Sequence, residues 1–290
     1  MPDSTILIPS ILNGLTMGAL YALIALGLTL IYGVLHIINF AHGALLMVGL
    51  YAVYFLNARF GIDPYVSLLI VPPLMFALGY TLQRGIIGRA SHGRDENILL
   101  ATLGLAIVIE NLALYFFRSD TRTIDVPYAF ETVKLLGAFI PLPKVVAFFG
   151  ALVTAAFLWL FMSRTATGRA IRAISKERKG AELVGIDTEH VYGLSFGLGI
   201  GCLGVAACLL LPTYYVTPQV GESFILIAFT IVVLGGMGSF IGALLGGLII
   251  GVVEAISGLY LGESLGQIGI FVIFILVLLF RPTGLLGHRV

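Results

Sequence analysis

The stretch Arg164-Thr-Ala-Thr-Gly-Arg-Ala-Ile-Arg-Ala-Ile-Ser-Lys-Glu-Arg-Lys-Gly-Ala-Glu-Leu-Val-Gly-Ile-Asp-Thr-Glu-His190 is a charged island in an apolar chain. It holds six of the sixteen Lys and Arg residues, and apolar runs long enough to span a membrane, which takes about 20 residues, flank it on both sides. Residues 164–190 therefore predict a loop in water between two membrane-spanning segments.

The composition agrees with a membrane protein. The chain has 290 residues, of which 59% are hydrophobic and only 11% are charged, whereas a soluble domain is about one quarter charged. The net charge of +1 comes from basic residues that are confined to loops. We expect contact with membrane lipid and no nucleic-acid partner.

Nine apolar segments have a length relevant to a membrane. In lipid only helices and closed barrels satisfy their own backbone groups, and these runs show no alternation of period two. The sequence predicts an all-α polytopic membrane protein with about 8–9 transmembrane helices, some short or interrupted, in a single domain over residues 1–290. Segment 222–235 is short enough to be re-entrant. The segments are 6–32, 43–57, 65–82, 97–117, 144–163, 191–212, 222–235, 240–260 and 267–281.

The Lys and Arg residues predict the orientation, because cytoplasmic loops carry an excess of them. With residues 164–190 inside, eleven basic residues are cytoplasmic (the six of this loop and five others) and five are outside. The N-terminus is then outside and the C-terminus is cytoplasmic, unless the loss of one span moves the N-terminus to the other side. The five other inner residues are Arg84, Arg89, Arg94, Arg281 and Arg289.

Several chemistries find no support in the chain. There is no Gly-Lys dipeptide, and hence no Walker A loop to hold ATP. A G-x-G-x-x-G pattern at 199–204 lies inside an apolar run, where helix packing explains it better than dinucleotide binding. No cluster of Cys and His indicates a metal, and no credible catalytic constellation is present. We expect a protein that is not an enzyme and binds no metal or cofactor itself.

Four polar residues inside or beside the apolar segments are candidates for a translocation path. Glu110 and Glu254 interrupt two spans, and intramembrane acids usually face the protein interior or a water-filled path. Asn39 and His42 lie in a polar break after the first segment, which is tolerated only where protein or water covers it. A purely structural hydrogen bond or turn is the alternative for each.

The charged island contains signals for a short helix. Ser175 is a candidate N-cap, residues 176–184 would form the helix, and Gly185 suits the left-handed residue after it. Spacing places Gly180, Leu183 and Val184 on one face, opposite Lys179 and Glu182. Such a helix can dock into a groove of a partner; the alternative is a basic loop held near anionic lipid. The predicted coupling segment comprises Ser175, Lys176, Glu177, Arg178, Lys179, Gly180, Ala181, Glu182, Leu183, Val184, Gly185 and Ile186.

The chain resembles a known family. Gly168-Arg-Ala-Ile-Arg-Ala173 and Ala181-Glu-Leu-Val-Gly-Ile186 are similar to the coupling-helix region of ABC importer permeases. Three further stretches narrow the resemblance to LivH-type permeases of branched-chain amino-acid transport systems: Asn13-Gly-Leu-Thr-Met-Gly-Ala-Leu-Tyr-Ala-Leu-Ile-Ala-Leu-Gly27, Ile38-Asn-Phe-Ala-His-Gly43 and Leu234-Gly-Gly-Met-Gly-Ser-Phe-Ile-Gly242. At Ser175 the family often has Asn, and both residues can cap.

The resemblance implies the ABC importer permease fold in a bacterial inner membrane. It also implies a second related permease subunit, two cytoplasmic ATPase subunits that bind the ATP, and a periplasmic or lipid-anchored binding protein. Permeases of this kind move branched-chain or other small amino acids, or urea and short amides. A proton-coupled secondary transporter that uses Glu110 or Glu254 is the alternative from another class. The outer connection 118–143 is either a docking surface for an outer partner or a solvated loop.

Overall fold

The computed structural model describes residues 4–91, 95–135, 137–262, 265–281 and 283–286. Within these residues seven helices are long and apolar enough to cross a membrane, and two further apolar helices, Val220–Gly235 and Gly266–Phe280, are shorter. Each of the nine apolar segments read from the sequence falls on one of them, so the prediction of a polytopic helical protein is confirmed. The basic residues Arg94 and Arg289, which were used to predict the orientation, lie outside the described residues.

The helices are α1 (Ser4–Leu35), α2 (His42–Phe60), α3 (Val71–Leu82), α4 (Gly88–Ser91), α5 (Asp95–Phe117), α6 (Leu142–Arg164), α7 (Ala166–Lys176), α8 (Arg178–Leu183), α9 (Thr188–Leu210), α10 (Val220–Gly235), α11 (Phe240–Leu261) and α12 (Gly266–Phe280). Short 3-10 turns lie at Val66–Leu69, Pro127–Phe130 and Leu211–Thr213, and a π-helical turn lies at Gln83–Ile87.

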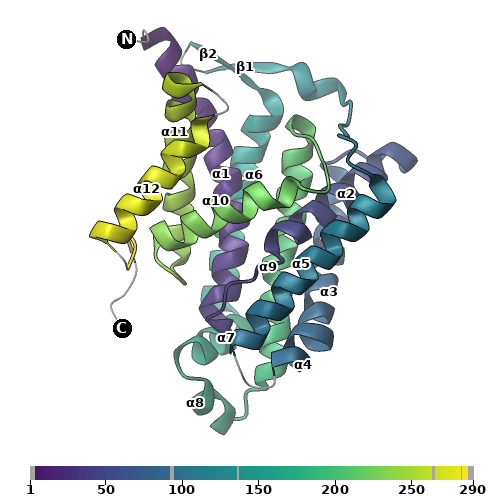
Figure 1. The fold of residues 1–290 in the computed structure, drawn as a ribbon, viewed down its shortest axis with the longest axis vertical. Helices are drawn as coiled ribbons and strands as arrows, with labels where there is room; N and C mark the ends of the chain where they lie inside the picture. Colours follow the sequence, from purple (N-terminus) through teal and green to yellow (C-terminus); the bar gives the residue numbers. More distant parts are fainter. Residues whose placement is uncertain (1–3, 92–94, 136, 263–264, 282, 287–290) are drawn as a thin grey trace.

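Helix α1 is the central element of the bundle and runs along its length from the N-terminus (Figure 1). It packs against α6, α9, α10 and α11. The closest packing is with α11, where a Cβ added at Gly14 or at Gly18 would lie 2.7 Å from the carbonyl oxygen of Gly251 or Gly247, respectively. These are the small-residue pairs that let membrane helices approach closely.

The chain breaks after α1 and turns back beside it. His36 has a left-handed backbone with φ 56°. The side chain of His42, the first residue of α2, lies with Nε2 3.0 Å from the Ile24 carbonyl oxygen, well before the end of α1. Helix α2 therefore begins inside the bundle, where the backbone of Gly43 touches that of Gly221 in the first turn of α10.

One end of the molecule carries a hairpin that was not predicted. Strands β1 (Thr132–Leu135) and β2 (Ala138–Pro141) pair antiparallel, with Thr132 opposite Pro141, and they lie beside the N-terminal end of α1 (Figure 1). Gly137 supplies the left-handed turn with φ 86°. Pro141 stands at the end of its strand, where a missing N–H is tolerated.

Segment 222–235 does not return to the side from which it starts. The stretch before α10 pairs with the outer connection through Arg122 and Val216, and α10 then lies obliquely across the middle of the bundle (Figure 1). The turn after α10 packs at Gly238 against Gly33, close to the other end of α1. The chain thus traverses the bundle between α9 and α11, so the re-entrant alternative is wrong.

Candidate functional site

Helix α7 anchors the charged island to the bundle. Thr165 caps it, because its hydroxyl accepts from the Gly168 N–H at 3.0 Å. Ile171 and Ile174 are buried in a cluster with Leu30, near the C-terminal end of α1. The opposite face is exposed and basic, with Arg169, Arg172 and Lys176. This helix was missed in the sequence, although Thr165 and the three-residue spacing of the two isoleucines are signals for it.

The predicted start of the coupling helix was wrong. Ser175 lies in the last turn of α7, and α8 begins only at Arg178. Glu177 occupies the N-cap with an extended backbone (φ −154°) and makes no side-chain capping bond. An N-cap needs a non-helical backbone, whereas burial of Ile174 holds the helix through Ser175 and Lys176.

The left-handed residue predicted after the helix is confirmed, although α8 ends at Leu183, one residue before the predicted end. Gly185 has φ 84°. Its N–H donates to the Glu182 carbonyl at 3.0 Å, and the Ile186 N–H donates to the Ala181 carbonyl at 3.1 Å. These two bonds form the Schellman arrangement, which needs a residue in the left-handed region and so favours glycine.

Side chains hold α8 in place against α9. The Glu182 carboxylate accepts from Arg178 Nε at 3.0 Å and from the Thr188 hydroxyl at 3.2 Å. Both bonds favour the charged carboxylate, so the pKa of Glu182 lies below its usual range. The Arg178 guanidinium lies 5.4 Å from the centre of the Tyr192 ring, and Ala181 is buried against the bundle.

Two large apolar side chains of this region face away from the bundle. Leu183 is 88% exposed and Val184 is 77% exposed, with the exposed charges of Lys179 and Glu182 beside them in the chain. We call Leu183 and Val184 the coupling surface. The pair lies at the end of the molecule that carries α7 and α8, opposite the hairpin (Figure 1).

The loop is also tied to α3. The Tyr80 hydroxyl lies 2.9 Å from Nδ1 of His190 in the first turn of α9. Arg84, in the π-helical turn, donates to the same hydroxyl at 3.0 Å. These side chains thus join the first turn of α9 to the C-terminal end of α3, next to the charged island.

The structure places Asn39 and His42 inside the protein. Asn39 Oδ1 accepts from the Ala41 N–H at 3.1 Å, and both side chains are almost fully buried. Asn39 Nδ2 and His42 Nδ1 have no hydrogen-bond partner within the described chain. They lie where α2 begins against α1, so their role as path residues stays a prediction.

The two intramembrane acids lie on different helices. Glu254 belongs to α11 and Glu110 to α5, and both residues are partly exposed. Their role in a translocation path stays a prediction.

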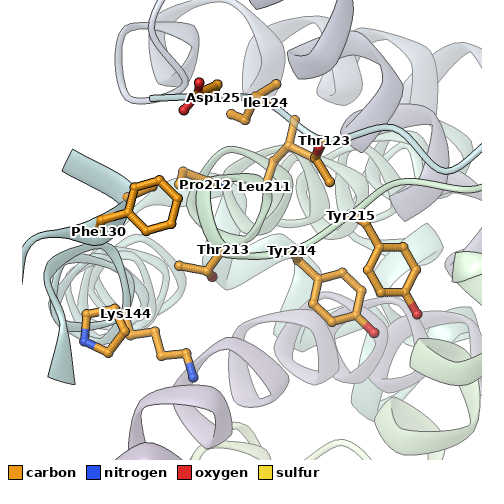
Figure 2. A pocket seen from close by; sticks show the side chains of 12 residues that line it. Thr123, Ile124, Asp125, Phe130, Lys144, Leu211, Pro212, Thr213, Tyr214 and Tyr215 are labelled. Atoms are coloured by element: carbon orange, nitrogen blue, oxygen red, sulfur yellow. The ribbon is translucent and has the colours of Figure 1, made fainter. Parts of the chain in front are cut away.

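A cavity of about 690 Å³ opens near the hairpin end. The connection after α5, the start of α6 and the end of α9 line it, with the Tyr214 and Tyr215 side chains next to each other on one wall (Figure 2). Lys144 Nζ donates to the Asn13 side-chain oxygen at 3.3 Å. We call this the outer cavity. Its lining residues are Thr123, Ile124, Asp125, Ala129, Phe130, Pro141, Lys144, Leu211, Pro212, Thr213, Tyr214 and Tyr215.

Comparison with known proteins covers nearly the whole chain. The family described as "Branched-chain amino acid transport system / permease component" matches residues 10–280. The chain is 34% identical to the high-affinity branched-chain amino acid transport system permease protein BraD of Pseudomonas aeruginosa, over 99% of this chain and 98% of that protein.

Two further relatives show the same pattern. The chain is 33% identical to the corresponding permease protein LivH of Escherichia coli, over 95% of this chain and 94% of that one. It is 29% identical to a probable branched-chain amino acid transport permease protein LivH of Methanocaldococcus jannaschii, over 92% and 89%. No solved structure gives a significant match.

Proposed function

The chain belongs to the family of branched-chain amino acid transport system permease components, and from this premise we propose that it is the membrane subunit of an ABC importer. It moves branched-chain or other small amino acids inward by alternating access. The energy comes from ATP that is hydrolysed on partner subunits.

The observation that carries this proposal is the coupling surface. Leu183 and Val184 are exposed although they stand at the end of a short helix fixed by Arg178, Glu182 and the Gly185 turn. Exposed apolar side chains on a rigid, charged support are typical of a surface that docks into a groove of another protein. The partner is the cytoplasmic ATPase.

The orientation follows from the distribution of charge and from the course of the chain. The end with α7 and α8 is the cytoplasmic one, because the basic face of Arg169, Arg172 and Lys176 lies there. The traverse between α9 and α11 keeps the parity of nine crossings, so the N-terminus is outside and the C-terminus is inside. The protein resides in a bacterial inner membrane.

The remaining partners occupy the other faces. A second, homologous permease subunit completes the membrane part, and two ATPase subunits bind at the cytoplasmic end. A periplasmic or lipid-anchored binding protein delivers the amino acid at the hairpin end. There the outer connection is held in place, since the Tyr128 hydroxyl donates to Asp63 Oδ2 at 2.7 Å.

Reconstitution of the complete system in proteoliposomes tests the proposal. We expect uptake of labelled leucine that requires ATP, the ATPase subunits and the binding protein together. A system whose ATPase subunits are catalytically inactive serves as control and should show no uptake. Uptake by this chain alone, driven by a proton gradient without ATP, would establish a secondary transporter and overturn the proposal.

A further inference from the structure

Another cavity lies at the end of the molecule that carries α8. It has a volume of about 890 Å³. Its walls come from the C-terminal end of α3 with the turn after it, from α4 and α8, and from the beginning of α9. Helices α4 and α8 lie near the same end of the molecule, away from the hairpin (Figure 1). We call this space the basic cavity, and its size is sufficient for a small ligand.

The charged side chains of the basic cavity are mainly arginines. Arg84 follows α3, Arg89 belongs to α4 and Arg178 begins α8. Arg178 is already paired with Glu182. Among the described residues that line the cavity, Glu189 is the only acid, and neither Arg84 nor Arg89 forms a side-chain ion pair with a described carboxylate. Because guanidinium groups are well suited to bind phosphate oxygens, this lining favours an anionic ligand.

A buried amide borders the same space. Gln83 is 3% exposed and lines the basic cavity. Its Oε1 has no hydrogen-bond partner within the described residues. An unpaired buried acceptor destabilises a protein, and a ligand with an O–H or N–H group would remove this cost. Gln83 therefore indicates, independently of the charge, that the ligand carries a hydrogen-bond donor.

The depth of the cavity in the membrane indicates the class of ligand. The segment Val66–Ala90 is long and apolar enough to span a membrane, and Arg84 and Arg89 lie in its last two turns. Arginines near the end of a spanning helix reach the headgroup region of the lipid. Leu35 and Ile98 add an apolar part to the wall. A phospholipid combines a phosphate with an apolar body, and basic pockets between spanning helices on the cytoplasmic side bind anionic headgroups.

We propose that the basic cavity binds the headgroup of an anionic phospholipid from the inner leaflet. Arg84 and Arg89 bind the phosphate, and Gln83 Oε1 accepts from a headgroup hydroxyl such as that of phosphatidylglycerol. Arg178 of α8 borders the same cavity, so the bound lipid also supports α8 from the side of α3. The inference goes beyond the proposed function and takes from it only that this end faces the cytoplasm.

Native mass spectrometry of the purified chain in detergent measures lipid binding directly. Phosphatidylglycerol should bind more tightly than phosphatidylcholine, which has no net charge and no headgroup hydroxyl. The double variant Arg84→Gln/Arg89→Gln should weaken binding of phosphatidylglycerol about 10- to 100-fold, as for the loss of hydrogen bonds to a charged group. The matched control is Arg169→Gln/Arg172→Gln, which removes two arginines from the exposed face of α7 and should leave this affinity unchanged.

Gln83→Leu should change stability and lipid binding in opposite directions. Leucine is of similar size and brings no acceptor. Without added lipid the melting temperature should rise, because the unpaired buried oxygen is gone. The affinity for phosphatidylglycerol should fall several-fold, because the headgroup hydroxyl loses its partner. A glutamine with a purely structural role would not give this combination.

The outcomes decide between a lipid, a soluble anion and no ligand. Equal binding of phosphatidylglycerol and phosphatidylcholine, or unchanged affinity in Arg84→Gln/Arg89→Gln, overturns the inference. Glycerol 3-phosphate carries the same phosphate and hydroxyl groups in soluble form, and binding as tight as that of phosphatidylglycerol would also overturn the lipid site. Should the double variant fail to fold, unchanged affinity in Gln83→Leu overturns the site and reduced affinity supports it. None of these measurements involves uptake or ATP, so they are independent of the test of the proposed function.

Discussion

Truncation of Leu183 to alanine tests the coupling surface with the least disturbance of the permease. The side chain is 88% exposed in this subunit, so nearly all of its apolar area is available for burial in the ATPase. The change removes three carbon groups at about 0.8 kcal/mol each, which amounts to about 2 kcal/mol of docking free energy. The affinity of the membrane part for the ATPase should fall about 30-fold.

The assay measures binding of purified ATPase to the permease in nanodiscs, together with ATP-driven uptake. The melting temperature of the permease should stay the same, because exposed Leu183 contributes little to its stability. Leu112→Ala, on an exposed face of α5, is a matched control and should bind ATPase normally. Unchanged ATPase affinity in Leu183→Ala would refute the assignment of the docking surface.

Three further predictions concern packing, charge and the outer tether. Gly18→Val should destabilise the bundle by about 1–3 kcal/mol, because an added Cβ lies 2.7 Å from a backbone oxygen of α11; thermal melting measures this, with Gly104→Ala, which meets open space, as control. Because the pKa of Glu182 is lowered, the stability that its charged carboxylate gives to α8 is present above the usual glutamate range and is lost as the pH falls through the lowered pKa. Hydrogen exchange in α8 should therefore become faster only at that low pH, and Glu182→Gln should show the fast exchange already at neutral pH. Tyr128→Phe removes the bond to Asp63 at 2.7 Å, worth about 1 kcal/mol, and should speed proteolysis of the outer connection while the core stays folded; unchanged cleavage would contradict this tether.

The positions of the spanning helices could be predicted, because whether a segment forms one depends on its own residues. An apolar run of sufficient length must satisfy its own backbone in lipid, and helix formation does so. The small-residue pairs of α1 and α11 can also be recognised in the sequence, since Gly14 and Gly18 stand four residues apart, as do Gly247 and Gly251. The structure brings these two pairs into direct contact.

The features that were missed depend on tertiary contacts. The start of α8 was misplaced because Ser175 looks like a cap locally, while the buried Ile174 continues α7 past it. The hairpin at residues 132–141 has strands of only 4 residues each, which do not stand out in a chain of long apolar runs. The packed rings of Tyr21, Phe224 and Tyr214 come from α1, from α10 and from the stretch after α9, and nothing in the spacing of these residues along the chain unites them.

Helix α1 connects the charged island with the middle of the bundle. Near its C-terminal end, Leu30 and Val34 pack with Ile171 and Ile174 of α7, in the same buried cluster as Ala181 of α8. Farther along the same helix, the Tyr21 ring packs edge-on against Phe224 of α10, with ring centres 6.0 Å apart. Because α1 is a continuous helix between these points, we expect that a displacement of α8 by the proposed ATPase partner, transmitted through α7, would also shift the contact between α1 and α10.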